Sequence, residues 1–356
     1  MTGFSVSHPR WPGVPLALAS AVLFGAAAPL SKPLSGALDP FMLAGLLYVG
    51  AGVGLLALRA VSLAGRREAR LNWRDGPWLA AAIAAGGVAA PALLMAGLAR
   101  TSASNAALLL NLEGVATIGV AWLVFRESVD RRLLLGACAI VGGAGVLAWG
   151  GGRVALDPGA ALVAAACLAW GIDNNLTRGI SAADPAAIAI WKGCVAGAAN
   201  VGLALAAGSR VPPIAAAVEA GLVGFVCVGV SLVLYIQALR RLGAARTGAY
   251  YALAPFVGAV LSVGLLGEPV TLRLAAAGLM MGVGLWLHLA ERHGHEHTHE
   301  ALEHDHLHTH DAHHRHAHDG AIAEPHAHPH RHDRLTHAHV HYPDLHHRHA
   351  HERERP

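Results

Sequence analysis

Apolar stretches of about twenty residues follow one another up to about Leu289, each long enough to cross a ~30 Å hydrocarbon layer as a helix. Short polar joints separate them. The pattern predicts an all-α integral membrane protein with ten transmembrane helices. Their expected ranges are 13–34, 38–63, 77–98, 103–125, 131–150, 158–179, 185–207, 214–238, 245–266 and 270–290.

The apolar stretches contain an internal repeat. One constant shift aligns the fourth and fifth spans with the ninth and tenth, and it pairs Arg100 with Arg241 and Glu127 with Glu268. Because each repeat has five helices, an odd number, we expect the second to enter the membrane from the opposite side. Inverted repeats of this kind are typical of secondary transporters, whose substrate sites lie near the midplane between the halves. The predicted units are repeats at 13–150 and 151–291 and a tail at 292–356.

Lys and Arg residues at the joints predict the orientation. If the N-terminus is cytoplasmic, thirteen of these cations face the cytoplasm and five face the opposite side. Basic residues in short loops are retained in the cytoplasm. We therefore expect a multi-pass protein of the cytoplasmic (inner) membrane with both termini inside. No basic segment with a cleavage site precedes Trp11, so we expect the first span to be retained.

The repeated glutamates and the ninth span carry a family resemblance. Glu127 and Glu268 end the fourth and ninth spans, and the second half reads Tyr251-Ala-Leu-Ala-Pro255 and then Leu266-Gly267-Glu268. Two five-helix halves with this pattern resemble the EamA-type permeases of the drug/metabolite transporter superfamily. The resemblance covers about residues 13 to 290 and implies a ten-helix transporter of small organic solutes that works by alternating access, often as an exporter.

The first half departs from the family pattern at an intramembrane acid. Gly114 stands where the family commonly has Pro, and Glu113 precedes it, so the resemblance gives Glu113 no role. Acids at such depth are usually functional, and the alternative is a structural Glu bonded or paired to another helix. A dry site favours the neutral carboxyl, which makes Glu113 a candidate to bind and release a proton. Asn111 lies about 200° around the helix, so we expect one of the two to join helices instead.

A polar segment interrupts the sixth span at Trp170-Gly-Ile-Asp-Asn-Asn-Leu-Thr-Arg178. On a helix, Asp173 shares a face with Thr177, and Asn174 shares one with Trp170 and Arg178. Such a segment is suited to binding a polar solute. The alternative is a polar helix end near the interface, with Arg178 reaching lipid headgroups.

Other charged residues have more than one interpretation. We expect Lys192, in the seventh span, either to line the transport path or to pair with Asp173 or Glu113, a pair that is costly in low dielectric unless well hydrogen-bonded. Glu127 and Glu268 lie at helix ends, where we expect them to fix turns through backbone hydrogen bonds.

The tail after Glu291 holds 23 of the 25 histidines and few large apolar residues, so we predict that it is disordered without ligand and cytoplasmic. Imidazoles at alternate positions suit divalent transition metals such as Zn, Ni and Co. The tail would deliver or sense a transported ion, buffer metal, act as a pH-sensitive tether, or have only incidental affinity. The expected ligands are His304, His306, His308, His310, His313, His314, His316 and His318.

These observations favour a permease for a small polar metabolite, passive or proton-coupled, with Glu113, Asp173, Asn174 and Lys192 along the path and a metal-binding regulatory tail. The alternatives are a Ni, Co or Zn permease or efflux protein, and a non-transporting membrane metal sensor. No nucleophile–base pair or phosphate loop is visible, so an enzyme is disfavoured and no cofactor is required. The expected partners are a solute or metal ion and the bilayer, not nucleic acid, and the protein is expected to be a monomer or homodimer.

Overall fold

The computed structural model describes most of the region with the predicted spans and four short segments of the tail. The described residues are 13–61, 73–125, 131–149, 157–179, 184–242, 247, 250–289, 294–299, 302–308, 326–332 and 335–340.

Helices fill the first half, and several are interrupted within one predicted span. The elements are α1 (Val14–Gly25), α2 (Ala27–Ser35), α3 (Pro40–Val61), the 3₁₀ turn η1 (Trp73–Asp75), α4 (Gly76–Ala82), the π-helical η2 (Ile83–Ala89), α5 (Ala90–Leu98), α6 (Ala103–Leu109), α7 (Leu112–Phe125) and α8 (Arg131–Ala148).

The second half repeats this order. Its elements are α9 (Pro158–Gly179), α10 (Pro185–Ala206), α11 (Ile214–Val223), the π-helical η3 (Gly224–Val230), α12 (Ser231–Leu242), α14 (Ala254–Leu266) and α15 (Leu272–Leu289). The two π-helical segments take equivalent places in the third and eighth predicted spans.

Aspartate followed by proline starts a helix in each half. Asp39 Oδ1 accepts hydrogen bonds from the backbone N–H groups of Phe41 and Met42, and Asp184 Oδ1 accepts one from Ala186. These carboxylates satisfy donors that the first helical turn leaves free, and the proline after each needs no N–H there. Asp39 and Asp184 therefore fix the points where α3 and α10 begin.

The all-α membrane part is confirmed. Of the described helices, seven are long and apolar enough to cross a membrane, and Ala254–Leu266 and Leu272–His288 are shorter apolar helices. α9 has 22 residues and carries the polar segment that begins at Trp170. Helices are thus present at all ten predicted positions.

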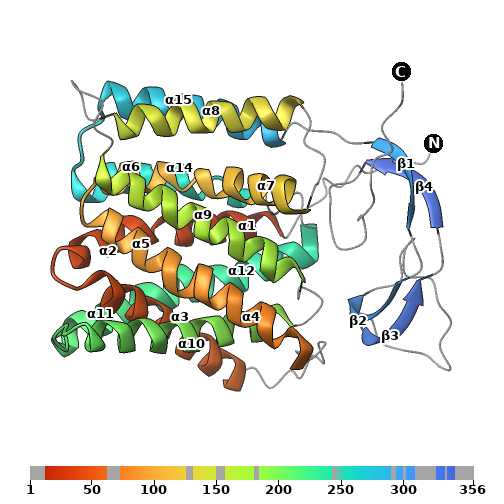
Figure 1. Ribbon diagram of the computed structural model, residues 1–356, viewed down its shortest axis with the longest axis horizontal. Helices are drawn as coiled ribbons and strands as arrows, with labels where there is room; N and C mark the ends of the chain where they lie inside the picture. Colours follow the sequence, from red (N-terminus) through yellow and green to blue (C-terminus); the bar gives the residue numbers. More distant parts are fainter. Residues whose placement is uncertain are drawn as a thin grey trace, which may run out of the picture.

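The halves pack against each other in matched pairs. α3 lies along α10, and α8 lies along α15. α1 packs on α12 and α14, while its counterpart α9 packs on α5 and α7. Figure 1 shows the α8–α15 pair as an outer layer, the α3–α10 pair on the opposite side, and α9 between them.

Two glycines at equivalent positions bring helices from opposite halves into backbone contact. A Cβ on Gly25 of α1 would lie 3.1 Å from the Cβ of Val257 on α14. A Cβ on Gly171 of α9 would lie 2.8 Å from the Cβ of Ala116 on α7. Only a residue without a side chain allows this approach in either half.

Four short segments of the predicted tail, residues 292–356, are described. Four strands are described there in two antiparallel pairs, β1 (Gly294–His299) with β4 (Leu335–Val340) and β2 (Leu302–His308) with β3 (His326–His332). Histidine alternates with other residues in these segments, and a period of two is the pattern of a strand. The disorder of the tail without ligand stays a prediction, and the rest of the tail lies outside the described residues.

Candidate functional site

The π-helical turn η2 exposes two backbone carbonyls to side chains from other helices. The oxygen of Gly86 accepts hydrogen bonds from Tyr48 Oη on α3 at 3.1 Å and from Trp170 Nε1 on α9 at 3.0 Å. The oxygen of Gly87 accepts one from Asn200 Nδ2 on α10 at 2.9 Å. π-helical turns are frequent at functional sites. Here the turn joins three helices at one level.

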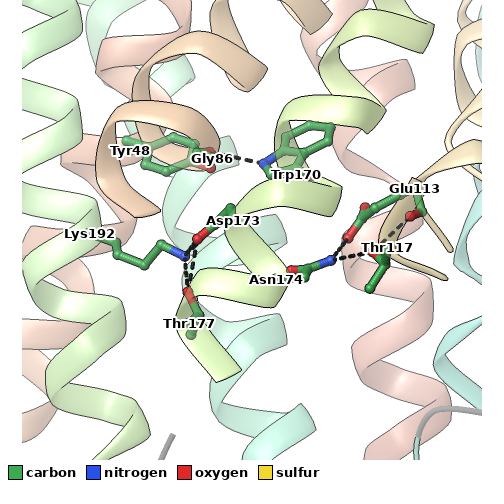
Figure 2. A network of polar contacts seen from close by, with 9 residues as sticks. All are labelled: Tyr48, Gly86, Glu113, Thr117, Trp170, Asp173, Asn174, Thr177 and Lys192. Carbon is green, nitrogen blue, oxygen red and sulfur yellow. Dashed lines mark hydrogen bonds and ion pairs between the residues drawn. The ribbon is translucent and has the colours of Figure 1, made fainter. Parts of the chain in front are cut away.

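Asp173 and Lys192 form a buried ion pair beside this turn (Figure 2). Lys192 Nζ on α10 lies 2.6 Å from each carboxylate oxygen of Asp173 on α9. Thr177 Oγ1, one turn further along α9, donates to Asp173 Oδ1 at 2.9 Å. A Cβ on Gly86 would collide with the Asp173 carboxylate, so glycine is required where η2 passes α9.

Glu113 and Asn174 form the second polar contact, and Figure 2 shows it on the other side of α9 from the ion pair. Asn174 Nδ2 donates to Glu113 Oε1 at 2.9 Å and lies 3.1 Å from Thr117 Oγ1. Thr117 in turn donates to the backbone carbonyl of Glu113 at 2.8 Å. Asn174 is exposed and Glu113 is half-buried.

α9 is held in place between the two contacts. Asn175 is buried, and its Nδ2 donates to the carbonyls of Thr117 on α7 and Gly171 on α9, at 3.0 and 2.8 Å. Three consecutive residues of α9 therefore take different tasks: Asp173 pairs with Lys192, Asn174 contacts Glu113, and Asn175 fixes α9 against α7.

Comparison with known proteins supplies the family. The sequence profile of the EamA-like transporter family matches residues 11–149 and again residues 157–290. The protein belongs to this family. The EamA-like transporter is thus a multi-pass membrane protein of a class that carries small molecules, as the sequence predicted.

Two other proteins are similar to this chain. The EamA-like transporter is 29% identical over 287 residues to an uncharacterized transporter of Methanothermobacter thermautotrophicus, covering 76% of this chain and 84% of that protein. A protein of known crystal structure aligns with a TM-score of 0.57 at 19% identity, covering 78% of this chain and 95% of the other. The second likeness shows a shared fold.

Asn111 of the EamA-like transporter lies outside the polar contacts described above. Its Nδ2 donates to the carbonyl of Leu108 at 2.8 Å and lies 3.9 Å from Met281 Sδ on α15, and the residue is buried. It occupies the turn between α6 and α7, two residues before Glu113. Asn111 therefore ties this interruption to α15.

Glu268 joins the two halves at a helix start. Its carboxylate accepts hydrogen bonds from the backbone N–H groups of Ala103 and Ser104, at 2.7 and 2.9 Å. These are the first residues of α6, so Glu268 fixes the turn through backbone hydrogen bonds as expected. Its repeat partner Glu127 lies outside the described residues.

Several expected positions fall partly or wholly outside the described residues. Arg178 lies on α9, but its side chain is not among those described. Three of the predicted metal ligands, His304, His306 and His308, lie in β2, but their side chains are not described. The other five lie outside the described residues: His310, His313, His314, His316 and His318.

Three residues of the polar region were missed by the sequence interpretation. Thr117 follows Glu113 by one helical turn, so spacing alone would have placed both on one face. Tyr48 and Gly86 gave a weaker signal, because a tyrosine and a glycine within apolar runs are common. Their hydrogen bond depends on the π turn, which hydropathy does not reveal.

Proposed function

We propose that this EamA-like transporter moves a small polar organic solute across the cytoplasmic membrane by alternating access. Glu113, Asp173, Asn174 and Lys192 line the path. The observation that carries the proposal is the pair of polar contacts on two sides of α9, which bring three ionisable side chains into the helical bundle. Intramembrane ionisable residues mark substrate and ion pathways.

The depth of Glu113 supports this placement. It lies ten residues after the start of the span Ala103–Val124, which is about 15 Å at 1.5 Å per residue and half of a ~30 Å layer. The helix is interrupted just before it, between α6 and α7. Transporter sites of the inverted-repeat type are built at the midplane from such discontinuous helices.

The contact between Asn174 and Glu113 joins the two halves, because α9 belongs to the second and α7 to the first. The Asp173–Lys192 pair lies within the second half. A shift of α9 against α7 would break the Glu113 contact, whereas the ion pair joins α9 to α10 within the second half. We assign proton coupling to Glu113 on this basis, since its carboxyl would change partners in each cycle.

The experiment starts with the solute. Metabolite profiles of cells and spent medium from a deletion strain identify compounds whose distribution changes, and these are then tested in vesicles. Glu113→Gln is expected to lower transport and flatten its pH dependence. Glu219→Gln, on an exposed position of α11, is the matched control. Unchanged rate and pH profile in Glu113→Gln would remove the coupling role.

The proposed orientation has both termini in the cytoplasm, as the distribution of Lys and Arg predicts. Reporter fusions at both ends test it. If a reporter that works only outside the cytoplasm is active when fused to either terminus, the proposed orientation is wrong.

We also propose that the tail binds divalent transition metal for regulation. The backbone register supports it: His304, His306 and His308 of β2 stand opposite His330, His328 and His326 of β3. Alternate residues of paired strands share a face, which places these imidazole-bearing positions together. Titration of Zn, Ni and Co into the full chain and into a chain ending at 292 tests this, and equal binding by both would refute it.

The metal-permease alternative stays a prediction. Among the side chains that the structure describes, no three from His, Cys, Asp or Glu gather where they could hold an ion. Metal content and growth of cells challenged with Ni, Co or Zn, with and without residues 293–356, test this alternative separately.

A further inference from the structure

Two oppositely charged side chains hold the joint between α5 and α6. Lys32 Nζ, on α2, donates hydrogen bonds to the backbone carbonyls of Leu98, where α5 ends, and Thr101, in the joint. The Glu268 carboxylate, just beyond α14, accepts hydrogen bonds from the first two backbone N–H groups of α6 and from the hydroxyl of Ser104. One cation and one anion thus satisfy four backbone groups at a place where two helix ends leave such groups without helical partners.

The sign of each charge suits the helix end that it meets. Carbonyl groups at the C-terminus of a helix carry partial negative charge, and N–H groups at the N-terminus carry partial positive charge. Lys32 meets carbonyls at the end of α5, and Glu268 meets N–H groups at the start of α6. Both contacts are therefore attractive, and both depend on the joint staying where it is.

The two charges come from helices that pack together. α2, which carries Lys32, packs on α14, which precedes Glu268. The spans on either side of the joint pack elsewhere as well, because α5 and α7 both lie along α9. α6 also packs on α14, so the joint is where the two groups of helices meet. Lys32 and Glu268 tie the two groups together at this point.

This end of the bundle is closely packed. α5 buries seven of its nine residues, and α6 buries six of its seven. The same two spans are far less buried at their other ends: α4 buries only Ala82, and of the described side chains of α7 only Ala121 is buried. Figure 1 shows α2, α5 and α6 at one end of the bundle and α4 and α7 at the other. The tight packing is therefore at the end that holds Lys32 and Glu268.

We propose that Lys32 and Glu268 form a latch that keeps this end of the transporter closed. Alternating access requires each end to open in turn, so α5 and α6 must separate here from α2 and α14. Separation breaks the contacts of both charges and leaves the four backbone groups to water. The latch rests on the proposed transport function, and it names the residues that set the balance between the closed and open states. In the proposed orientation this end faces away from the cytoplasm.

The reactivity of a buried cysteine measures how often this end opens. The four native cysteines are replaced by alanine, and Ser104→Cys or Thr101→Cys is introduced into the full chain. Ser104 and Thr101 are only 2% and 8% exposed, so labelling of the purified protein by N-ethylmaleimide requires opening. The labelling rate is then proportional to the fraction of open molecules. Each charge is removed in the chain whose reporter contacts the other charge, so that the change does not itself uncover the reporter.

Lys32→Met should speed labelling in the Ser104→Cys chain at least about tenfold. Hydrogen bonds to charged groups contribute more than the about 1.4 kcal/mol that corresponds to this factor. Loss of a nearby positive charge by itself disfavours the reactive thiolate, so a faster reaction reports opening. Glu268→Ala should speed labelling in the Thr101→Cys chain by a similar factor. Glu268→Gln, which keeps an acceptor oxygen, should have a smaller effect than Glu268→Ala.

The matched control is Arg273→Met. Arg273 Nη1, on α15, also donates to a carbonyl just beyond a helix end, that of Trp149 at 2.7 Å, but this contact joins α15 to the end of α8. Both labelling rates should stay unchanged in this variant. Each variant is first compared with its parent chain by melting. Parental labelling rates in Lys32→Met and Glu268→Ala overturn the proposal, and so does an equal rise in Arg273→Met. Variants that melt earlier but label at the parental rate would mean that the two charges only brace the fold.

Failure of the transport function would look different. If labelling rises as expected but no solute crosses vesicles, the latch stands and the proposed transport is wrong. If a solute found by metabolite profiling is transported and the variants label at the parental rate, the latch is wrong and transport stands.

Discussion

Removing Lys192 tests how the buried ion pair supports α9. The Asp173 and Lys192 side chains are only 6% and 19% exposed, so the value of 0–1 kcal/mol typical of surface pairs does not apply. Lys192→Met keeps the length of the side chain but leaves the Asp173 carboxylate with Thr177 as its described partner. Breaking a buried pair in this way costs about 3–5 kcal/mol of the free energy of unfolding.

The assay is reversible unfolding by SDS titration in mixed micelles, applied as a double-mutant cycle. Asp173→Asn with Lys192→Met removes both charges, so we expect the double variant to recover about 2 kcal/mol or more relative to the sum of the single changes. The matched control is Arg59→Met, which breaks the pair with Asp184. Because Arg59 is 53% exposed, its loss should cost at most about 1 kcal/mol.

Additive effects in the cycle would refute the reasoning, because they would mean that Asp173 does not depend on Lys192 for stability. A Lys192→Met cost no larger than that of Arg59→Met would refute the burial argument as well. In either case the short distances between Lys192 and Asp173 would contribute little to the free energy of unfolding.

Further changes test other features of the fold. Gly86→Ala should impair transport and stability, because its Cβ would collide with Asp173. Gly202→Ala, where a Cβ meets nothing within 4 Å, should change neither. Vesicle assays measure the transport and melting curves measure the stability. Glu268→Ala should cost about 1–2 kcal/mol through the lost cap on α6, measured by SDS titration, and no loss would mean that the cap is replaced by solvent. Deleting residues 293–356 should abolish tight Zn binding without changing the melting temperature of the helical part. A large drop in that temperature would mean that the tail also stabilises the helices.

The positions of the helices could be predicted from the sequence, because a bilayer imposes one length and one composition on every span. The pairing of Asp173 with Thr177 also follows from helical spacing alone. Lys192 was assigned two possible partners, Asp173 and Glu113, and the structure shows the first. Choosing between them needed the distance between α9 and α10, which spacing within one helix does not give.

The interruptions of the helices could not be predicted. η2 begins at Ile83, and Pro91 of the same span lies beyond it, in α5. The Gly86 and Gly87 carbonyls of η2 accept hydrogen bonds from Tyr48, Trp170 and Asn200. These donors come from three other helices, so the sequence of one span does not reveal them. The contact of Asn174 with Glu113 likewise depends on tertiary packing.

The paired crossings at Gly25 and Gly171 constrain how the halves can move. At each crossing two backbones touch with no side chain between them, so pulling the helices apart would open a void that nothing nearby fills. Rotation about the point of contact keeps the backbones together. We therefore expect the helices to pivot at these two glycine contacts, one in each half, while the rest of the bundle tilts around them. A larger residue at either point would move the hinge, and with it the distance over which Asn174 swings away from Glu113.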